Sequence, residues 1–162
     1  MMETFVNKQI VGWPISSRTD NALFQKDFPR LTDTAAKKTS EPTAQYNCIA
    51  WAFEDNTKWW WPMRRRYWPL SYDGLTTMEA FLKLLATDGW VKTDNRFFES
   101  GARKIALYAN VFDGQPTHAA RLLENGAWTS KLGENIDISH DLHELEGPTY
   151  GTVVAVFSRT VG

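Results

Sequence analysis

Residues Lys104–Leu132, which read KIALYANVFDGQPTHAARLLENGAWTSKL, carry the clearest indication of the fold. Apolar runs at 104–109 and 118–123 predict two strands, and the run at 127–132 predicts a third. The Asn125-Gly126 pair is typical of a tight hairpin turn between the second and third strands. These residues therefore predict an antiparallel meander.

Two helices are predicted upstream of this meander. The run Cys48–Phe53 is apolar and rich in alanine, which favours a helix, and Asn47 is a good N-cap that would place Cys48 in the first turn. Thr76 and Glu79 form a capping-box pattern. The apolar residues that follow it at helical spacing are Phe81, Leu84 and Leu85, and the helix is expected to end at Asp88-Gly89. Helices followed by strands, the last at 152–157, predict an α+β fold.

The length of 162 residues fits one domain, 1–162. Residues 1–45 carry few periodic signals and three X-Pro steps, so we expect an extended N-terminal arm packed on a core formed by residues 46–162. The arm's apolar residues that motivate this packing are Phe5, Val6, Ile10, Val11, Trp13, Leu23, Phe24, Phe28 and Leu31.

Composition narrows the possible functions. A net charge of −1 gives no global field to attract nucleic acid or anionic lipid, so neither a nucleic acid nor a membrane is expected as a partner. The sequence has no run long and apolar enough for a membrane span and no basic-then-apolar leader, which predicts a cytoplasmic protein, with secretion by a route without a cleaved signal as the alternative. The single cysteine excludes an internal disulfide and a multi-cysteine zinc site, and we expect neither a metal nor a cofactor.

The one cysteine lies where a nucleophile would be activated. A helix N-terminus favours the thiolate of Cys48, and a neighbouring imidazole would take its proton. Three histidines are available. His118 opens a predicted strand, whereas His140 and His143 are predicted to lie around a polar, exposed helix near 141–146, so His118 is favoured. The pair His140 and His143 lacks a convincing third metal ligand.

A cysteine at a helix start, a later strand that begins with histidine, an Asn-Gly turn and a returning strand resemble the order of the papain-like cysteine hydrolase superfamily. The resemblance is greatest to its NlpC-like branch. The segments Tyr46–Ala52 and Trp128–Gly133 also resemble an uncharacterised bacterial family. The resemblance implies a papain-like α+β fold, in which N-terminal helices that carry the cysteine pack on a small antiparallel sheet that carries the histidine.

The resemblance also implies roles for individual residues. Cys48 would attack, His118 would carry the proton, and a third group would hold the imidazole. By turn spacing the third position falls near Ser130, while Asp137 lies just beyond the strand and is the alternative. Gln45, three residues before the cysteine, would donate to an oxyanion.

The predicted function is a cysteine-dependent hydrolase or acyltransferase that acts on an amide or thioester bond, as a peptidase, amidase or deamidase. A peptide or protein substrate, a cognate inhibitor protein and a bacterial effector or toxin setting are expected by analogy.

The alternative is a non-catalytic module in which Cys48 is a buried structural thiol and a Trp-rich face binds a protein or sugar. The loop Trp59–Trp68 has two corresponding interpretations. It either covers the core as a lid or forms a groove in which Trp60 and Trp61 contact the substrate.

Overall fold

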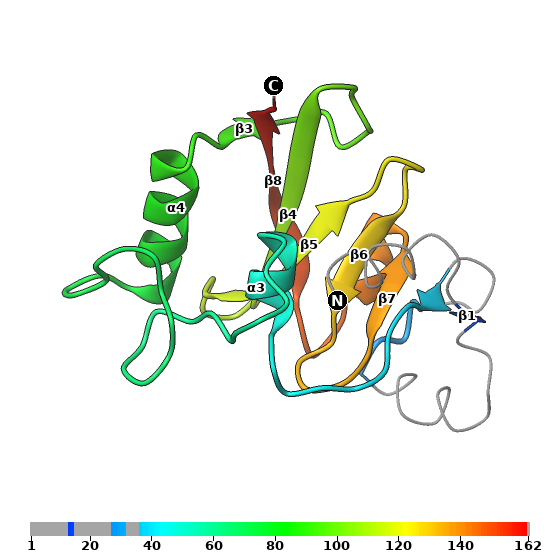
Figure 1. Ribbon diagram of the computed structural model, residues 1–162, viewed down its shortest axis with the longest axis horizontal. Coiled ribbons are helices and arrows are strands. Elements are labelled where there is room, and N and C mark those ends of the chain that lie inside the picture. Colours follow the sequence, from blue (N-terminus) through cyan, green and yellow to red (C-terminus); the bar gives the residue numbers. More distant parts are fainter. Residues whose placement is uncertain (1–12, 15–26, 32–35, 162) are drawn as a thin grey trace.

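The computed structural model describes residues 13–14, 27–31 and 36–161, and for 13–14 only the backbone. The described residues form one eight-stranded sheet with two short α-helices and a 3-10 helix (Figure 1). The strands are β1 (Trp13–Pro14), β2 (Lys37–Lys38), β3 (Val91–Thr93), β4 (Ala102–Ala109), β5 (Pro116–Leu122), β6 (Trp128–Lys131), β7 (Asp137–His140) and β8 (Thr152–Thr160). The helices are α3 (Cys48–Ala52), α4 (Thr77–Thr87) and η1 (Leu142–Leu145).

The sheet is antiparallel at every pairing and has the strand order β1-β2-β7-β6-β5-β4-β8-β3. Strands β4 to β6 follow one another as the predicted meander, β7 adds a further strand next to β6, and β8 returns to pair with β4. The predicted Asn-Gly hairpin is confirmed: Gly126 adopts a φ of 88°, which the turn requires and glycine tolerates.

The two faces of the sheet bury different cores, because successive side chains of a strand point to opposite faces. On the face that we call the η1 face, Tyr108, Ala120 and Ile138 pack with Phe28 of the arm and with Leu145 of η1. On the opposite face, which we call the α3 face, α3 and α4 pack on the strands. The buried residues there are Cys48, Ile49, Ala52, Phe81, Leu85, Trp90, Ile105, Leu107, Ala119 and Phe157.

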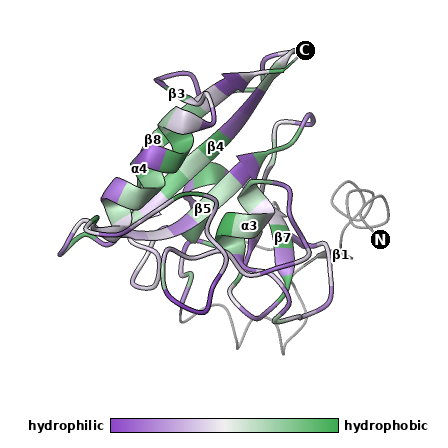
Figure 2. Cartoon of the chain, turned by 60° about the vertical axis from the view of Figure 1, so that its left-hand side comes forward, coloured by the Kyte–Doolittle hydropathy of each residue, from purple (hydrophilic) through white to green (hydrophobic). Residues whose placement is uncertain are grey.

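Both predicted helices are confirmed with their caps. The Asn47 side chain accepts from the Ala50 N–H, and all five residues of α3 are buried, which agrees with the hydrophobic colouring of α3 in Figure 2. The Thr76–Glu79 capping box opens α4. Its residues Phe81, Leu84 and Leu85 are all buried, as expected.

The predicted papain-like α+β fold is wrong. The described chain is mostly an antiparallel sheet, and its α-helices span only five and eleven residues. Four strands of two to four residues, β1, β2, β3 and β7, extend the predicted meander. Segments of this length show at most one or two repeats of a two-residue period, so their pairing depends mainly on neighbouring strands.

Parts of the predicted arm join this sheet. β1 pairs with β2, β2 pairs with β7, and Phe28 and Leu31 are buried in the core of the η1 face. Residues 1–12, 15–26 and 32–35 of the arm, and with them Phe5, Val6, Ile10, Val11, Leu23 and Phe24, lie outside the described residues. Among the helices that the structure describes, none has the length and apolarity needed to cross a membrane.

Candidate functional site

Cys48 occupies the first position of α3, as predicted, and is 6% exposed. Burial raises the pKa of its thiol to about 11. The backbone N–H groups of Ala119 and Ile49 and the ammonium group of Lys131 act in the opposite direction and favour the thiolate. The resting thiol is therefore protonated, with donors and a cation already around the sulfur.

His118 is fully buried in β5 between two aromatic rings. The ring of Tyr150 stacks on the imidazole with 4.0 Å between centroids and 11° between planes, and Tyr108 approaches it edge-on at 5.0 Å. Burial lowers the pKa of His118 well below its ordinary value, and the nearby His140 lowers it further. His118 is thus a neutral imidazole near neutral pH.

A chain of hydrogen bonds runs from His118 through Ser130 to His140. Ser130 Oγ lies 2.8 Å from His118 Nε2 and 2.7 Å from His140 Nε2, and His140 Nδ1 lies 2.7 Å from the carbonyl oxygen of Asp141. His118, Ser130 and His140 are each at most 1% exposed. Because these side chains have almost no exposure to solvent, Ser130 Oγ is the hydrogen-bond partner of Nε2 in both histidines.

The donors and acceptors in this series of hydrogen bonds determine which ring nitrogens carry hydrogen. A carbonyl oxygen only accepts, so His140 Nδ1 carries hydrogen, and burial lowers the pKa of His140 to about 4 so that its Nε2 is bare. Ser130 then donates to His140 Nε2 and accepts from His118 Nε2–H. His118 Nδ1 is left as a lone pair, and this buried atom has no hydrogen-bond partner among the described residues.

Cys48 and His118 lie on opposite faces of the sheet. His118 pairs with Tyr108, a residue of the η1 face, whereas Cys48 packs with Ala119 on the α3 face. The backbone of β5 pairs with that of β6 only through Arg121–Thr129 and Leu122–Trp128, so His118 and Ala119 have no backbone pairing partner on β6. There the Cys48 sulfur interacts with the Ala119 N–H.

Tyr150 joins the two residues. Its ring stacks on His118, and the pKa of its hydroxyl is raised first by burial and then by the nearby Cys48. The expected contact between thiol and imidazole is not a hydrogen bond, because His118 Nδ1 has no partner.

Of the two candidates for the third position, Ser130 contacts His118 and Asp137 does not. Asp137 pairs with Lys131 across the β6–β7 hairpin, one residue out of phase with Ser130, so its side chain points to the opposite face. Its carboxylate accepts hydrogen bonds from Thr39 and from Tyr46.

Gln45, the predicted oxyanion donor, is exposed. Its backbone N–H donates to Thr43 Oγ1, and within the described part of the chain its side chain has no bond to Cys48.

The aromatic loop packs as a lid on the core of the α3 face. Trp60 and Trp61 are partly buried against this core, where Trp60 stacks on Phe53 at 5.2 Å and Trp61 meets Phe81 edge-on at 5.3 Å. Asn47 Oδ1 accepts from the Trp60 N–H and Asn47 Nδ2 donates to the Trp60 carbonyl, so the residue that caps α3 also holds the lid. These contacts favour the core-lid interpretation of the loop.

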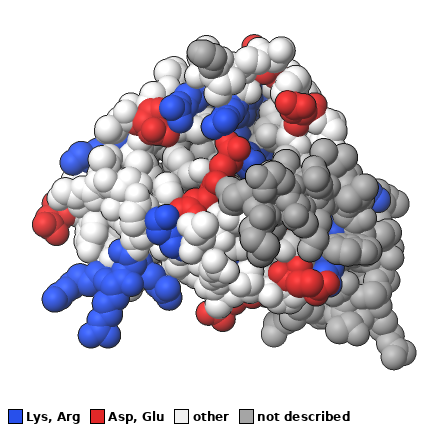
Figure 3. All heavy atoms as spheres, in the orientation of Figure 1, with Lys and Arg blue, Asp and Glu red and all other residues white. Residues whose placement is uncertain are grey.

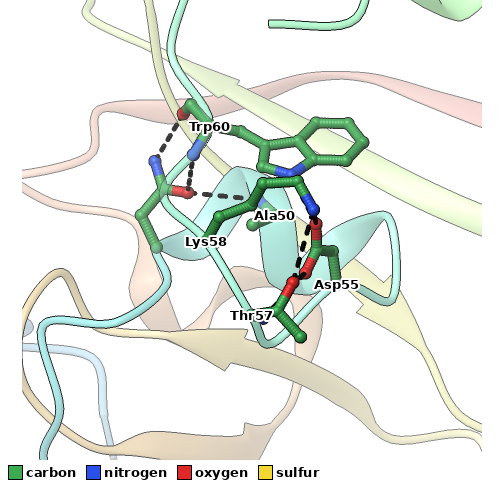
Figure 4. A network of polar contacts seen from close by, with 6 residues as sticks. Ala50, Asp55, Thr57, Lys58 and Trp60 are labelled. Carbon is green, nitrogen blue, oxygen red and sulfur yellow. Dashed lines mark hydrogen bonds and ion pairs between the residues drawn. The ribbon is translucent and has the colours of Figure 1, made fainter. Parts of the chain in front are cut away.

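The polar contacts at the end of α3 support the same interpretation. The Asp55 carboxylate accepts hydrogen bonds from Thr57 and from Trp60 Nε1, and it forms an ion pair with Lys58 (Figure 4). Arg64, Arg65 and Arg66 lie within this loop and are exposed, and basic side chains gather on one side of the molecule (Figure 3).

His140 and Tyr150 are site residues that the sequence interpretation missed. His140 was expected near an exposed helix, but it lies on β7 and is 1% exposed. The signal that could have found it is the alternation of Ile136 and Ile138 after the turn at Gly133, which marks a strand. Among the described residues, no group of three or more His, Cys, Asp or Glu side chains is arranged to hold a metal ion.

Comparison with known proteins gives one match. No curated protein and no solved structure is significantly similar to the chain. A family model described as a domain of unknown function, DUF7689, matches residues 37–158, which include Cys48, His118, Ser130 and His140. The chain therefore belongs to the DUF7689 family.

Proposed function

We propose that the protein is a cysteine-dependent acyl-transfer enzyme, a hydrolase or acyltransferase, with Cys48 as nucleophile and His118 as general base. The observation that carries the proposal is the unpaired Nδ1 lone pair of His118, buried next to the residue whose N–H contacts the Cys48 sulfur. An unsatisfied buried nitrogen costs about 1–3 kcal/mol, so its retention calls for a role. Accepting the proton of the thiol is such a role.

The reaction would begin from the neutral pair. Cys48 Sγ attacks the acyl carbon while its proton passes to His118 Nδ1, and the bond to the leaving group breaks as that group takes the proton from Nδ1. Water then attacks the thioester and gives a proton to Nδ1. The C–S bond breaks, and the thiol regains its proton.

Ser130 and His140 would support the base. As His118 becomes a cation, its Nε2–H keeps Ser130 Oγ as acceptor, and Ser130 in turn keeps its bond to His140. Tyr150 and Thr117 border the histidine and are partly exposed, so the acyl group would enter beside them.

The test uses p-nitrophenyl acetate as a general acyl donor. We expect the intact mass to rise by one acetyl group on Cys48, together with a burst of p-nitrophenol. His118→Asn should abolish the burst, and Cys48→Ser should remove the acetylated cysteine. His143→Asn is the matched control, because His143 is half-exposed and takes no part in the His118–Ser130–His140 hydrogen bonds. This variant should leave the burst intact. Equal acylation of the wild type and His118→Asn would contradict the proposal.

A further inference from the structure

Lys131 is a fully buried lysine one residue beyond Ser130. Its ammonium group donates to the carbonyl oxygens of Thr43, at 2.7 Å, and Gly133, and it lies 5.1 Å from the centroid of the Tyr46 ring. Thr43 and Tyr46 belong to the segment that leads directly into Cys48. A buried ammonium is costly, so these contacts must fix its place closely.

Two successive residues of β6 therefore act on the two members of the proposed Cys48–His118 pair, one on each face of the sheet. Ser130 points to the η1 face and bonds to His118, while Lys131 points to the α3 face and holds the segment before Cys48. The charge of Lys131 also acts on the Cys48 sulfur, and that of Cys48 acts on Lys131.

We propose that Lys131 is a positioning residue for Cys48. Lys131 fixes the segment before α3 and stabilises the Cys48 thiolate electrostatically. This inference rests on the proposed function, in which Cys48 is the nucleophile. The property that it predicts is the reactivity of the Cys48 thiol, which can be measured without a substrate. The ionisable groups around Lys131 are Asp137 on β7, Glu134 in the β6–β7 turn, Tyr46 and Cys48. Those around Cys48 are Lys131 and Tyr150.

The assay is alkylation of Cys48 by iodoacetamide in the full chain, followed by mass spectrometry across a pH range. Lys131→Met should lower the alkylation rate near neutral pH about tenfold, the effect of a one-unit rise in the thiol pKa. Lys131→Arg, which keeps the charge, should restore most of the rate. Circular dichroism confirms that each variant is folded. A folded Lys131→Met variant with the wild-type rate overturns the inference, as does an Arg variant no faster than Met.

A second measurement needs no variant. Burial lowers the pKa of Lys131 to about 8, so Lys131 should lose its charge above that pH while the thiol is still mostly protonated. The wild-type rate should therefore rise tenfold per pH unit below this point and less steeply above it. A uniform rise through this range overturns the inference.

The two proposals fail separately. If alkylation depends on Lys131 but the acetyl donor leaves no mark on Cys48, the acyl-transfer function is wrong and the role of Lys131 stands. If acylation occurs but Lys131→Met leaves the alkylation rate unchanged, the role of Lys131 is wrong and the acyl-transfer function stands.

Discussion

Replacing Ser130 with alanine tests the hydrogen-bonded chain in the sheet. The hydroxyl is 0% exposed and bonds to two imidazoles, so the change leaves both His118 Nε2–H and His140 Nε2 without a partner in a dry site. Each orphaned buried group costs about 1–3 kcal/mol. Because the alanine also leaves room for slight relaxation, we expect a loss of about 2–4 kcal/mol in the free energy of unfolding.

Urea unfolding followed by tryptophan fluorescence measures this loss. Ser139→Ala is the matched control, because Ser139 is also buried in the β6–β7 hairpin and its hydroxyl has no hydrogen bond within the described residues. It should cost no more than about 0.5 kcal/mol. A Ser130→Ala loss as small as that of Ser139→Ala would show that the two imidazoles do not depend on the hydroxyl and would refute the assigned proton arrangement.

Further predictions concern pH, the lid and one glycine. The folded pKa of His140, about 4, lies below its unfolded value, so its contribution to stability is lost as pH falls from about 6.5 toward 4. Burial raises the pKa of Asp137 to about 6, so protonation of this carboxylate stabilises the folded state as pH falls, opposite to the effect of His140. Asp137→Asn should therefore steepen the fall in unfolding free energy with falling pH, and His140→Gln should flatten it. Parallel slopes in urea titrations would count against this assignment. Trp60→Ala should cost about 3–5 kcal/mol in a urea melt because the ring covers the core of the α3 face, and a near-neutral change would return the loop to a binding role. Gly151→Ala should prevent native folding by circular dichroism, since the added methyl would overlap the carbonyl oxygen of Ala109; a native spectrum would contradict it.

Local elements were predictable because their signals are local. A capping box and a run of apolar residues at helical spacing lie within one segment, so α4 and its buried face followed from residues 76–89 alone. The Asn125-Gly126 turn likewise sets the strands on either side of it. Turn spacing was also enough to bring Ser130 near His118, because a hairpin brings its two strands into register.

Part of the site was not accessible in this way. Asp137 was an alternative to Ser130 until the register of β6 and β7 was known, since a shift of one residue moves a side chain to the other face. His140 lies in a strand of only four residues, too short for its alternation to outweigh the polar residues around it.

Short-range signals in the sequence were enough to specify α3 with its Asn47 cap, α4 and the central meander, because caps, turns and periodicity act over a few residues. The fold class, in contrast, depended on long-range pairing. Pairing among β1, β2 and β7, and between β3 and β8, depends on segments far apart in the chain. The three-dimensional arrangement also places Cys48 on the α3 face and His118 on the η1 face, in the part of β5 that does not pair with β6, since a packing relation between a helix and two strands leaves no pattern in any one of them.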